Sequence, residues 1–247
     1  GLRLAMASAA APSGETRLGL VSTFPKQRTE TLGEALLVTS IFFILLSYLP
    51  FRRMQTTLDP AASAACGQFM LVRASCYQNF GGHEALRDSM HDGVKMPRLA
   101  RKAGWGTDLF SGVDVASCRM YRGFREAWDG FAKNAYEGLG NIWLLSLLTM
   151  LHLIGHILPV PLLLIAVLAS TGDSVRWIAI LAAASAIFLG IAQRMVIASH
   201  QRHSAAAAPL HALGVLLMTL VQWWSLYLSL RGRRSWRGRT LTADLAA

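Results

Sequence analysis

IWLLSLLTMLHLIGHILPVPLLLIAVLA, residues 142–169, decides the class of this fold, because it has no charged residue over a length that can cross a bilayer. Pro159 and Pro161 interrupt the backbone hydrogen bonding of a helix, so we expect a kink or a split there. Two further apolar segments follow, a shorter one at 177–192 and a full-length one at 210–230. The sequence therefore predicts a membrane region in the second part of the chain.

Composition changes at the start of this region. Hydrophobic residues make up 53% of the chain and charged residues 15%, against about 25% charged in a typical globular domain. Twelve of the fourteen acidic residues precede residue 141, and only four charged residues lie between 141 and 230. We expect a polar domain over 1–140, a membrane region over 141–230 and a basic, cytoplasmic-type tail over 231–247.

The net charge of +10 raises the question of nucleic-acid binding. No recognition module accompanies the charge, which argues against a nucleic-acid partner. Five arginines gather directly after the last apolar segment, where arginine usually meets anionic lipid headgroups. The three cysteines, Cys66, Cys76 and Cys118, form no CxxC pair; they fit a reducing compartment and are expected to be small buried apolar residues.

Residues 31–50 (TLGEALLVTSIFFILLSYLP) are apolar at their centre but short for a membrane span. An interfacial or re-entrant helix ending at Pro50 is one interpretation, and a buried core helix is the other. The rest of the polar part alternates between strand and helix patterns. Strands are expected at 18–22, 64–73 and 107–115, and helices at 94–103, starting or kinking at Pro97, and at 124–139.

The stretch GGHEALRDSMHDGVKMPRLARKAG, residues 81–104, concentrates acids and histidines ahead of a run of cations. An aspartate beside glycine before a helix can cap that helix, which is a structural role. Asp92 could instead act as a general base if a substrate hydroxyl comes within hydrogen-bond reach. Asp88 and His91 would then support it, and no spacing in the cluster matches a metal site.

Two other groups of residues could carry chemistry. Arg119, Arg122 and Arg125 are spaced by three, so a helix would align them to bind a diphosphate or lipid headgroups. Four histidines form a pattern that resembles, in a poorer version, the boxes of membrane di-iron oxidases; interhelical hydrogen bonding is the simpler interpretation. These four are His152, His156, His200 and His203.

Several motifs occur together in a fixed order. They are GQFMLVR (67–73), NFGGHEALRDSMHDG (79–93), LARKAG (99–104) and CRMYRGFREAWDGFAKN (118–134), followed by the apolar segments. VSTFPKQRTETLGEALL (21–37) and WRGR (236–239) extend the pattern. In this order the chain resembles the membrane-bound family 2 glycosyltransferases, in particular their hopanoid-associated and ceramide-glucosyltransferase-like branch.

The resemblance implies an α/β catalytic domain of the GT-A type on the cytoplasmic face of the inner membrane, followed by a transmembrane helical region. Such enzymes move a sugar from a nucleotide-sugar, usually a UDP-sugar, to an acceptor with inversion, and use Mg²⁺ or Mn²⁺. Asp92 matches the catalytic aspartate that accepts the proton of the acceptor hydroxyl. Arg119 and Arg122 match the stretch near the donor diphosphate, and the turn Gly81, Gly82, His83 matches the acceptor site. The acceptor expected is a lipid.

Three departures accompany the resemblance. His91 stands before Asp92, where the family commonly has a second acid, and RMYRG stands where many relatives have QxxRW. The chain has no DxD motif, so the metal ligands are expected in a nucleotide-binding half ahead of Gly1, and the chain alone is expected to be inactive. The alternative is a non-catalytic membrane partner or a degenerate paralogue, with a di-iron oxidase third. The sequence names neither the sugar nor the lipid.

Overall fold

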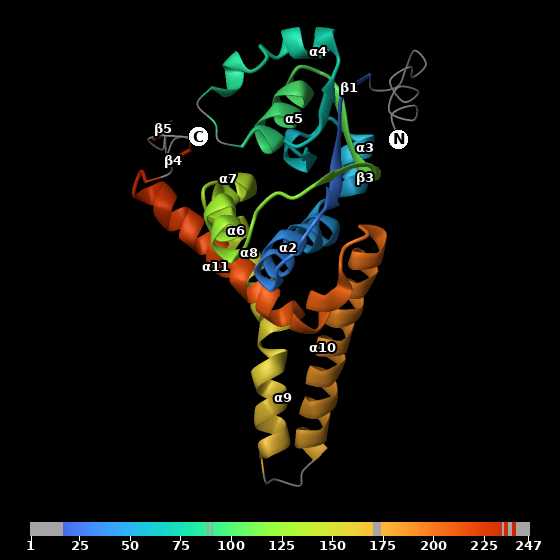
Figure 1. The fold of residues 1–247 in the computed structure, drawn as a ribbon, viewed down its shortest axis with the longest axis vertical. Coiled ribbons are helices and arrows are strands. Elements are labelled where there is room, and N and C mark those ends of the chain that lie inside the picture. The colour runs from blue at the N-terminus through green and yellow to red at the C-terminus, as the bar shows by residue number, and fades with distance from the viewer. Residues whose placement is uncertain are drawn as a thin grey trace. The chain divides into compact units, whose positions relative to one another are not determined.

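The structure, a computed structural model, describes residues 17–87, 89, 91–169, 174–233, 235–236 and 239–240 (Figure 1). The chain packs into two compact units, each built from two stretches of sequence. Unit 1 comprises the described residues of 1–28 and 44–118, and unit 2 those of 29–43 and 119–247. Packing therefore divides the chain after residue 118, whereas its composition changes at residue 141.

Unit 1 has a small sheet with helices. Its elements are β1 (Leu18–Gln27), α3 (Phe51–Thr56), the 3-10 helix η1 (Pro60–Ala62), β2 (Met70–Val72), α4 (Ala74–Asn79), the 3-10 helix η2 (Glu84–Leu86), α5 (Asp92–Lys102) and β3 (Gly106–Cys118). The strand order is β2-β1-β3, with β2 antiparallel and β3 parallel to β1. The strands expected at 18–22 and 107–115 are confirmed and are longer than expected. The strand expected at 64–73 is wrong except for its last part, β2.

The core of unit 1 lies between this sheet and α5. Met96 and Ala100 stand four residues apart on α5, so they share a helix face, and both are buried against Leu20 and Trp105. Arg101, on the neighbouring position, is also buried. Its guanidinium donates to Thr107 on β3 and to the carbonyls of Met54, Thr57 and Asp59, which ties the segment after α3 to the sheet.

The helix expected at 94–103 is confirmed as α5, which begins at Asp92, so Pro97 lies inside the helix and does not start it. A proline inside a helix leaves the carbonyl four residues before it without its usual donor. That carbonyl belongs to Gly93, and it accepts a hydrogen bond of 2.7 Å from the Ala65 N–H instead. The cost of Pro97 is therefore reduced by a contact with residues 64–69, which explains why this segment does not continue β2.

Unit 2 contains the long apolar helices. Its elements are α6 (Phe124–Ala132), α7 (Ala135–Leu139), α8 (Ile142–His152), the π-helix η3 (Leu153–Ile157), α9 (Pro159–Leu168), α10 (Ser174–His200), the 3-10 helix η4 (Ala205–Leu210) and α11 (His211–Leu230), with a short pair β4 (Ser235–Trp236) and β5 (Arg239–Thr240). Among the described residues, three helical stretches are long and apolar enough to cross a membrane: 142–168, 174–200 and 205–230. The chain is therefore a membrane protein, as predicted.

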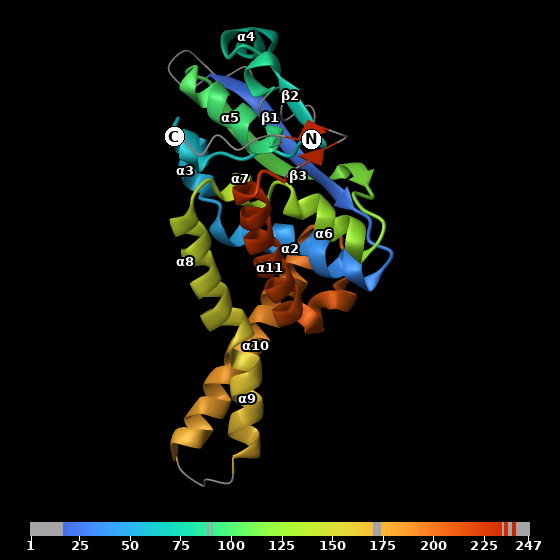
Figure 2. The same cartoon turned by 90° about the vertical axis from the view of Figure 1, so that its left-hand side faces the viewer.

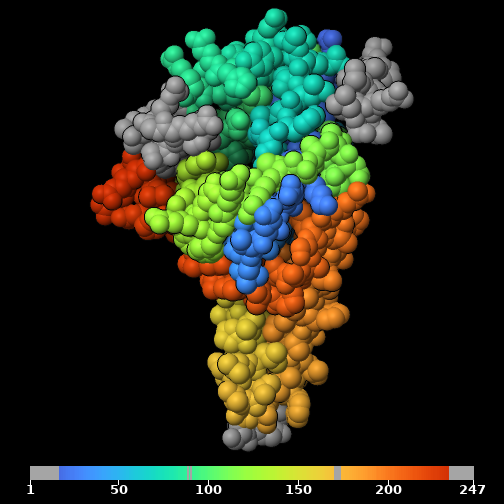
Figure 3. All heavy atoms as spheres, in the orientation of Figure 1, coloured from blue at the N-terminus to red at the C-terminus, as the bar shows by residue number. Residues whose placement is uncertain are grey.

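The first stretch is split, as its prolines predicted: a π-helical turn separates α8 from α9, which starts at Pro159. The second stretch is 27 residues long, so the segment expected at 177–192 was predicted too short. Helices α9 and α10 lie side by side as neighbours within unit 2 (Figures 2 and 3). The single helix expected at 124–139 is wrong, because the chain breaks between α6 and α7.

Helix α2 (Leu32–Tyr48) fills most of the stretch 31–50. Its residues up to Phe43 belong to unit 2, and those from Ile44 belong to unit 1. Nearly every residue from Glu34 to Phe43 is buried, and this includes polar side chains as well as apolar ones. A helix that is buried on all sides is a core helix, so residues 34–43 fit the second interpretation, a buried core helix. An interfacial position for the remainder stays a prediction.

Candidate functional site

Asp92 is the first residue of α5, and its side chain is exposed. Its Oδ1 accepts a hydrogen bond of 2.7 Å from the Gly93 N–H, and the position at a helix N-terminus favours a negative charge. A Cβ atom placed on Gly67 would lie 2.9 Å from Oδ1 and 3.1 Å from Oδ2 of Asp92. The carboxylate therefore lies directly over the backbone of Gly67 and keeps an open side toward solvent.

Residues 65–67 form the surface beneath this carboxylate, which we call the floor of the site. A Cβ atom on Gly93 would lie 2.5 Å from the Ala65 carbonyl oxygen, so only glycine allows the helix to approach this closely. Ser22 on β1 fixes the other side of the floor, because its hydroxyl accepts from the Cys66 N–H at 2.7 Å and donates to the Phe69 carbonyl at 2.8 Å. Burial raises the pKa of the Cys66 thiol to about 11, and the nearby charge of Asp92 adds to this.

The turn predicted beside the acceptor site is built around Tyr77 of α4. Gly81 and Gly82 have φ angles of +84° and +60°, which favour glycine. The Tyr77 hydroxyl lies 2.7 Å from His83 Nδ1 and accepts from the His83 N–H at 3.0 Å. The exposed His83 ring is thus held by a hydrogen bond at Nδ1. The turn belongs to the same unit as Asp92, and its role in binding an acceptor stays a prediction.

Of the two residues expected to support Asp92, Asp88 lies outside the described residues. His91 precedes α5 and is half-buried. Its carbonyl accepts from the N–H groups of Val94 and Lys95, and its own N–H donates to the Ser89 hydroxyl at 3.1 Å. The His91 backbone therefore takes part in starting the helix that carries Asp92, and a role of its side chain beside the carboxylate stays a prediction.

Arg119 belongs to unit 2 and is held by two carboxylates. Its Nε and Nη2 atoms lie 3.2 and 2.9 Å from the two oxygens of Glu34, and its Nη1 atom lies 2.6 Å from Glu30. Glu34 is fully buried, and it also accepts from the N–H groups of Glu30 and Gly123 and from the Thr31 hydroxyl. The hydrogen bonds from Arg119 dominate, and they lower the pKa of Glu34 from 4.5 to about 2.

The prediction that Arg119, Arg122 and Arg125 align on one side of a helix is wrong. Residues 119–123 are not helical, and α6 begins only at Phe124. Arg122 is exposed, and its N–H donates to Glu126 at 2.6 Å. Arg125 is 96% exposed and lies 3.9 Å from Asp129. A diphosphate would therefore meet Arg122 first, whereas Arg119 would have to give up a carboxylate. Phosphate binding by either residue stays a prediction.

Three histidines gather around Phe43 of α2 in unit 2: His152, His156 and His211. His156 Nδ1 and His211 Nε2 are 3.1 Å apart, so one donates to the other. His152 Nδ1 lies 2.9 Å from the Thr219 hydroxyl, which already donates to the Val215 carbonyl, so Nδ1 carries the proton. Interhelical hydrogen bonding thus explains His152 and His156. His211 was missed, since it stands alone at the start of its span.

The residues present do not fit the divalent metal that the family resemblance implies. Among the described residues, no group of three or more histidine, cysteine, aspartate or glutamate side chains is arranged to hold a metal ion. The histidine-box interpretation lacks a ligand set within the same residues.

Glu34 was not singled out as a site residue, although a local signal for it exists. Thr31 and Glu34 have the spacing of a capping box, in which a glutamate in the first turn bonds back to the helix start. Its partner Arg119 is 85 residues away along the chain, and no local pattern indicates that pairing. Gly67 was missed because the apolar residues around it have a strand-like pattern.

Comparison with protein-family models, with proteins of described function and with solved structures finds no match to this chain. In the part of the chain that the structure describes, the fold combines three candidate membrane-spanning helical stretches with a small mixed sheet.

Proposed function

We propose that this chain takes part in an inverting transfer of a sugar from a nucleotide-sugar, most simply a UDP-sugar, to the hydroxyl of a membrane lipid. The observation that carries the proposal is the carboxylate of Asp92, exposed at the start of α5 and fixed over Gly67. Membrane spans in the same chain support a lipid acceptor. The order of motifs along the sequence supports the reaction class.

In the proposed step, the acceptor oxygen attacks the anomeric carbon of the sugar, and its proton passes to a carboxylate oxygen of Asp92. The bond between that carbon and the diphosphate oxygen breaks, and the nucleoside diphosphate leaves with the electron pair. We place unit 1 on the cytoplasmic face of the inner membrane, where nucleotide-sugars are made.

The geometry at Asp92 suits a base for two reasons. One oxygen is occupied by the Gly93 N–H, which fixes the orientation of the carboxylate. The open side leaves the carboxylate free to accept a proton from a hydroxyl within about 3 Å. Gly67 lets the carboxylate approach closely, because it has no side chain between its backbone and Asp92.

The experiment uses membranes that contain the protein made from its complete coding sequence. Labelled UDP-glucose and other nucleotide-sugars are added, and labelled lipid is separated by chromatography. We expect one donor to label a lipid in the wild type and Asp92→Asn to abolish the signal. Asp108→Asn is the matched control, because Asp108 also accepts from the next residue's N–H, at 2.9 Å, in the same unit. Equal losses in both variants would remove Asp92 from the proposed role.

One observation favours a second candidate, a non-catalytic membrane partner. Arg119, which the family resemblance assigns to the diphosphate, instead joins the start of α2 to the segment before α6. A chain that no longer binds a donor could retain this arginine for stability alone. No labelled lipid with any nucleotide-sugar would support this candidate.

A further inference from the structure

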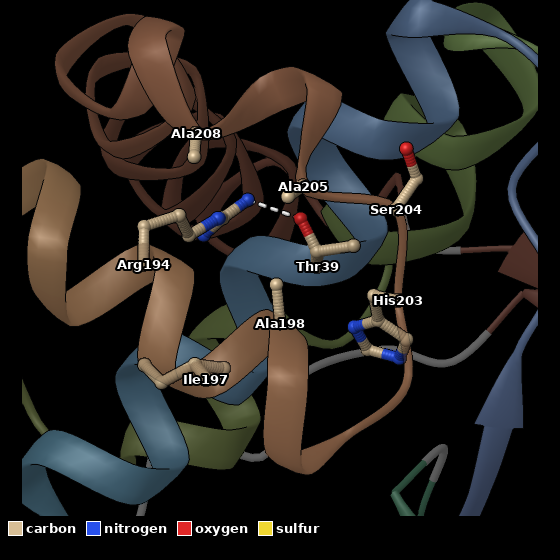
Figure 4. Close-up of a pocket in the computed structure, with 8 residues that line it drawn as sticks. All are labelled: Thr39, Arg194, Ile197, Ala198, His203, Ser204, Ala205 and Ala208. Atoms are coloured by element: carbon tan, nitrogen blue, oxygen red, sulfur yellow. Dashed lines mark hydrogen bonds between the residues drawn. The ribbon is translucent and has the colours of Figure 1, made fainter.

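Arg194 is a buried cation in a membrane-spanning helix. It lies on α10, is 4% exposed, and belongs to the wall of a crevice within unit 2 (Figure 4). The other lining residues are mostly small or polar: Thr39, Ile197, Ala198, His203, Ser204, Ala205 and Ala208. A charged side chain at membrane depth is costly, so it is by default a candidate for a functional site.

The hydrogen bonds of Arg194 do not neutralise it. Its guanidinium donates to the hydroxyl of Thr39, as Figure 4 shows, and makes long contacts of 3.4 Å to the Ser40 hydroxyl and the Ala35 carbonyl. Both hydroxyls already donate their own protons to carbonyls of α2, so their oxygens only accept. All three acceptors are neutral. A guanidinium has five N–H donors, and these contacts leave part of that capacity unused.

No counter-charge is near Arg194 among the described residues, where no carboxylate forms an ion pair with it. Between residues 141 and 230 the sequence holds a single acid, Asp173, near the opposite end of α10. The crevice is too narrow for a water molecule, so water inside it does not supply the missing acceptors. An unpaired buried charge of this kind is strongly unfavourable without an anion.

The position of Arg194 along α10 indicates which anion can reach it. It precedes the last residue of the helix, His200, by six positions, or about 9 Å at 1.5 Å per residue. The whole helix of 27 residues measures about 40 Å, close to the thickness of a bilayer with its headgroups. Arg194 therefore lies near the boundary between hydrocarbon and headgroups, which is the level of lipid phosphates.

We infer that Arg194 binds the phosphate of an anionic membrane lipid. The planar guanidinium can present paired donors to two phosphate oxygens. Ser204 adds a donor: its hydroxyl accepts from the Ala206 N–H at 3.3 Å, and its own proton remains available. The crevice as it stands is too small for a phosphate, so binding requires movement of the connection 203–205, in which the His203 ring packs edge-on against Phe42. This site is independent of Asp92 and stands whether or not the chain transfers a sugar.

The test compares melting temperatures of the purified full chain in a neutral detergent with three additions: phosphatidylglycerol, phosphatidylcholine and inorganic phosphate. We expect phosphatidylglycerol to raise the melting temperature of the wild type by several degrees, and the other two to raise it little. Arg194→Gln should remove this gain and be at least as stable as the wild type without lipid. Arg176→Gln is the control, because Arg176 lies on the same helix and bonds carbonyls of α9. It should respond as the wild type does.

Three results would overturn the inference. They are an equal gain in Arg194→Gln, an equal gain of the wild type with inorganic phosphate, and a lower melting temperature of lipid-free Arg194→Gln. The last result would show that Arg194 is needed for packing alone. Ser204→Ala is a second test, which leaves Arg194 in place. It should need at least tenfold more phosphatidylglycerol for half of the wild-type gain, and an unchanged requirement would contradict the site.

Discussion

Replacing Glu34 with glutamine tests how unit 2 is held together. The change keeps the size of the side chain and removes its charge, so the hydrogen bonds from Arg119 lose their ionic component. A carboxyl pKa that drops from 4.5 to about 2 corresponds to at most about 3 kcal/mol of folding free energy at neutral pH. Arg119 is 27% exposed and Glu30 49% exposed, so solvent screens the group. We therefore expect a loss of about 1 to 2 kcal/mol.

The contribution of Glu34 depends on pH in a defined direction. Its pKa in the folded protein lies below the unfolded value, so the stabilisation is complete above pH 4.5 and fades as the pH falls toward 2. At neutral pH the loss should lower the melting temperature by about 3 to 6 °C. At pH 3 the difference between wild type and Glu34→Gln should shrink to about two fifths of that value.

The assay follows tryptophan fluorescence during thermal unfolding of the detergent-solubilised chain at pH 7 and pH 3. Glu30→Gln is the matched control, since Glu30 is half exposed and makes the outer ion pair to the same arginine. It should change the melting temperature by less than half as much. A Glu34→Gln protein that melts with the wild type at pH 7, or a deficit that is unchanged at pH 3, would refute the reasoning.

Three further predictions concern unit 1. Gly67→Ala places a methyl group 2.9 Å from Asp92 Oδ1 and should slow sugar transfer at least tenfold with little change in melting temperature; an unchanged rate would contradict the site geometry. Arg101→Lys loses most of the hydrogen bonds to the loop after α3 and should cost about 2 to 4 kcal/mol by thermal unfolding; a neutral effect would contradict its bracing role. Burial raises the pKa of the Cys66 and Cys76 thiols to about 11, so a maleimide at pH 8 should modify the half-buried third cysteine first in peptide mapping; modification of either buried thiol first would contradict that burial.

Periodicity and composition predicted the parts of the fold that depend on local sequence. The charge-free stretch 142–169 formed a helical pair around its prolines, and the helical spacing of 94–103 formed α5, with Ala100 in the core. Strands β1 and β3 also appeared where their apolar runs predicted them. Each of these elements was predictable because its pattern of apolar residues lies within a short stretch of sequence.

Contacts between distant residues were not predictable in the same way. The segment 64–69 has the apolar pattern of a strand, yet Ala65 bonds Gly93, a residue on α5, because Pro97 frees that carbonyl. Arg119 pairs with Glu34 across 85 positions, so it could not form the helical stripe that its spacing predicted. Asp92 itself was predicted from motif order, and its exposure over Gly67 became visible only in the structure.

The central claim is that Asp92 accepts a proton during sugar transfer to a lipid hydroxyl, and its most direct test is a ratio of initial rates. Wild type and Asp92→Asn are compared in the same membranes, at equal protein level and with the same labelled nucleotide-sugar. Loss of a general base predicts a rate at least about 100-fold lower for the variant. A rate within about threefold of the wild type would contradict the account.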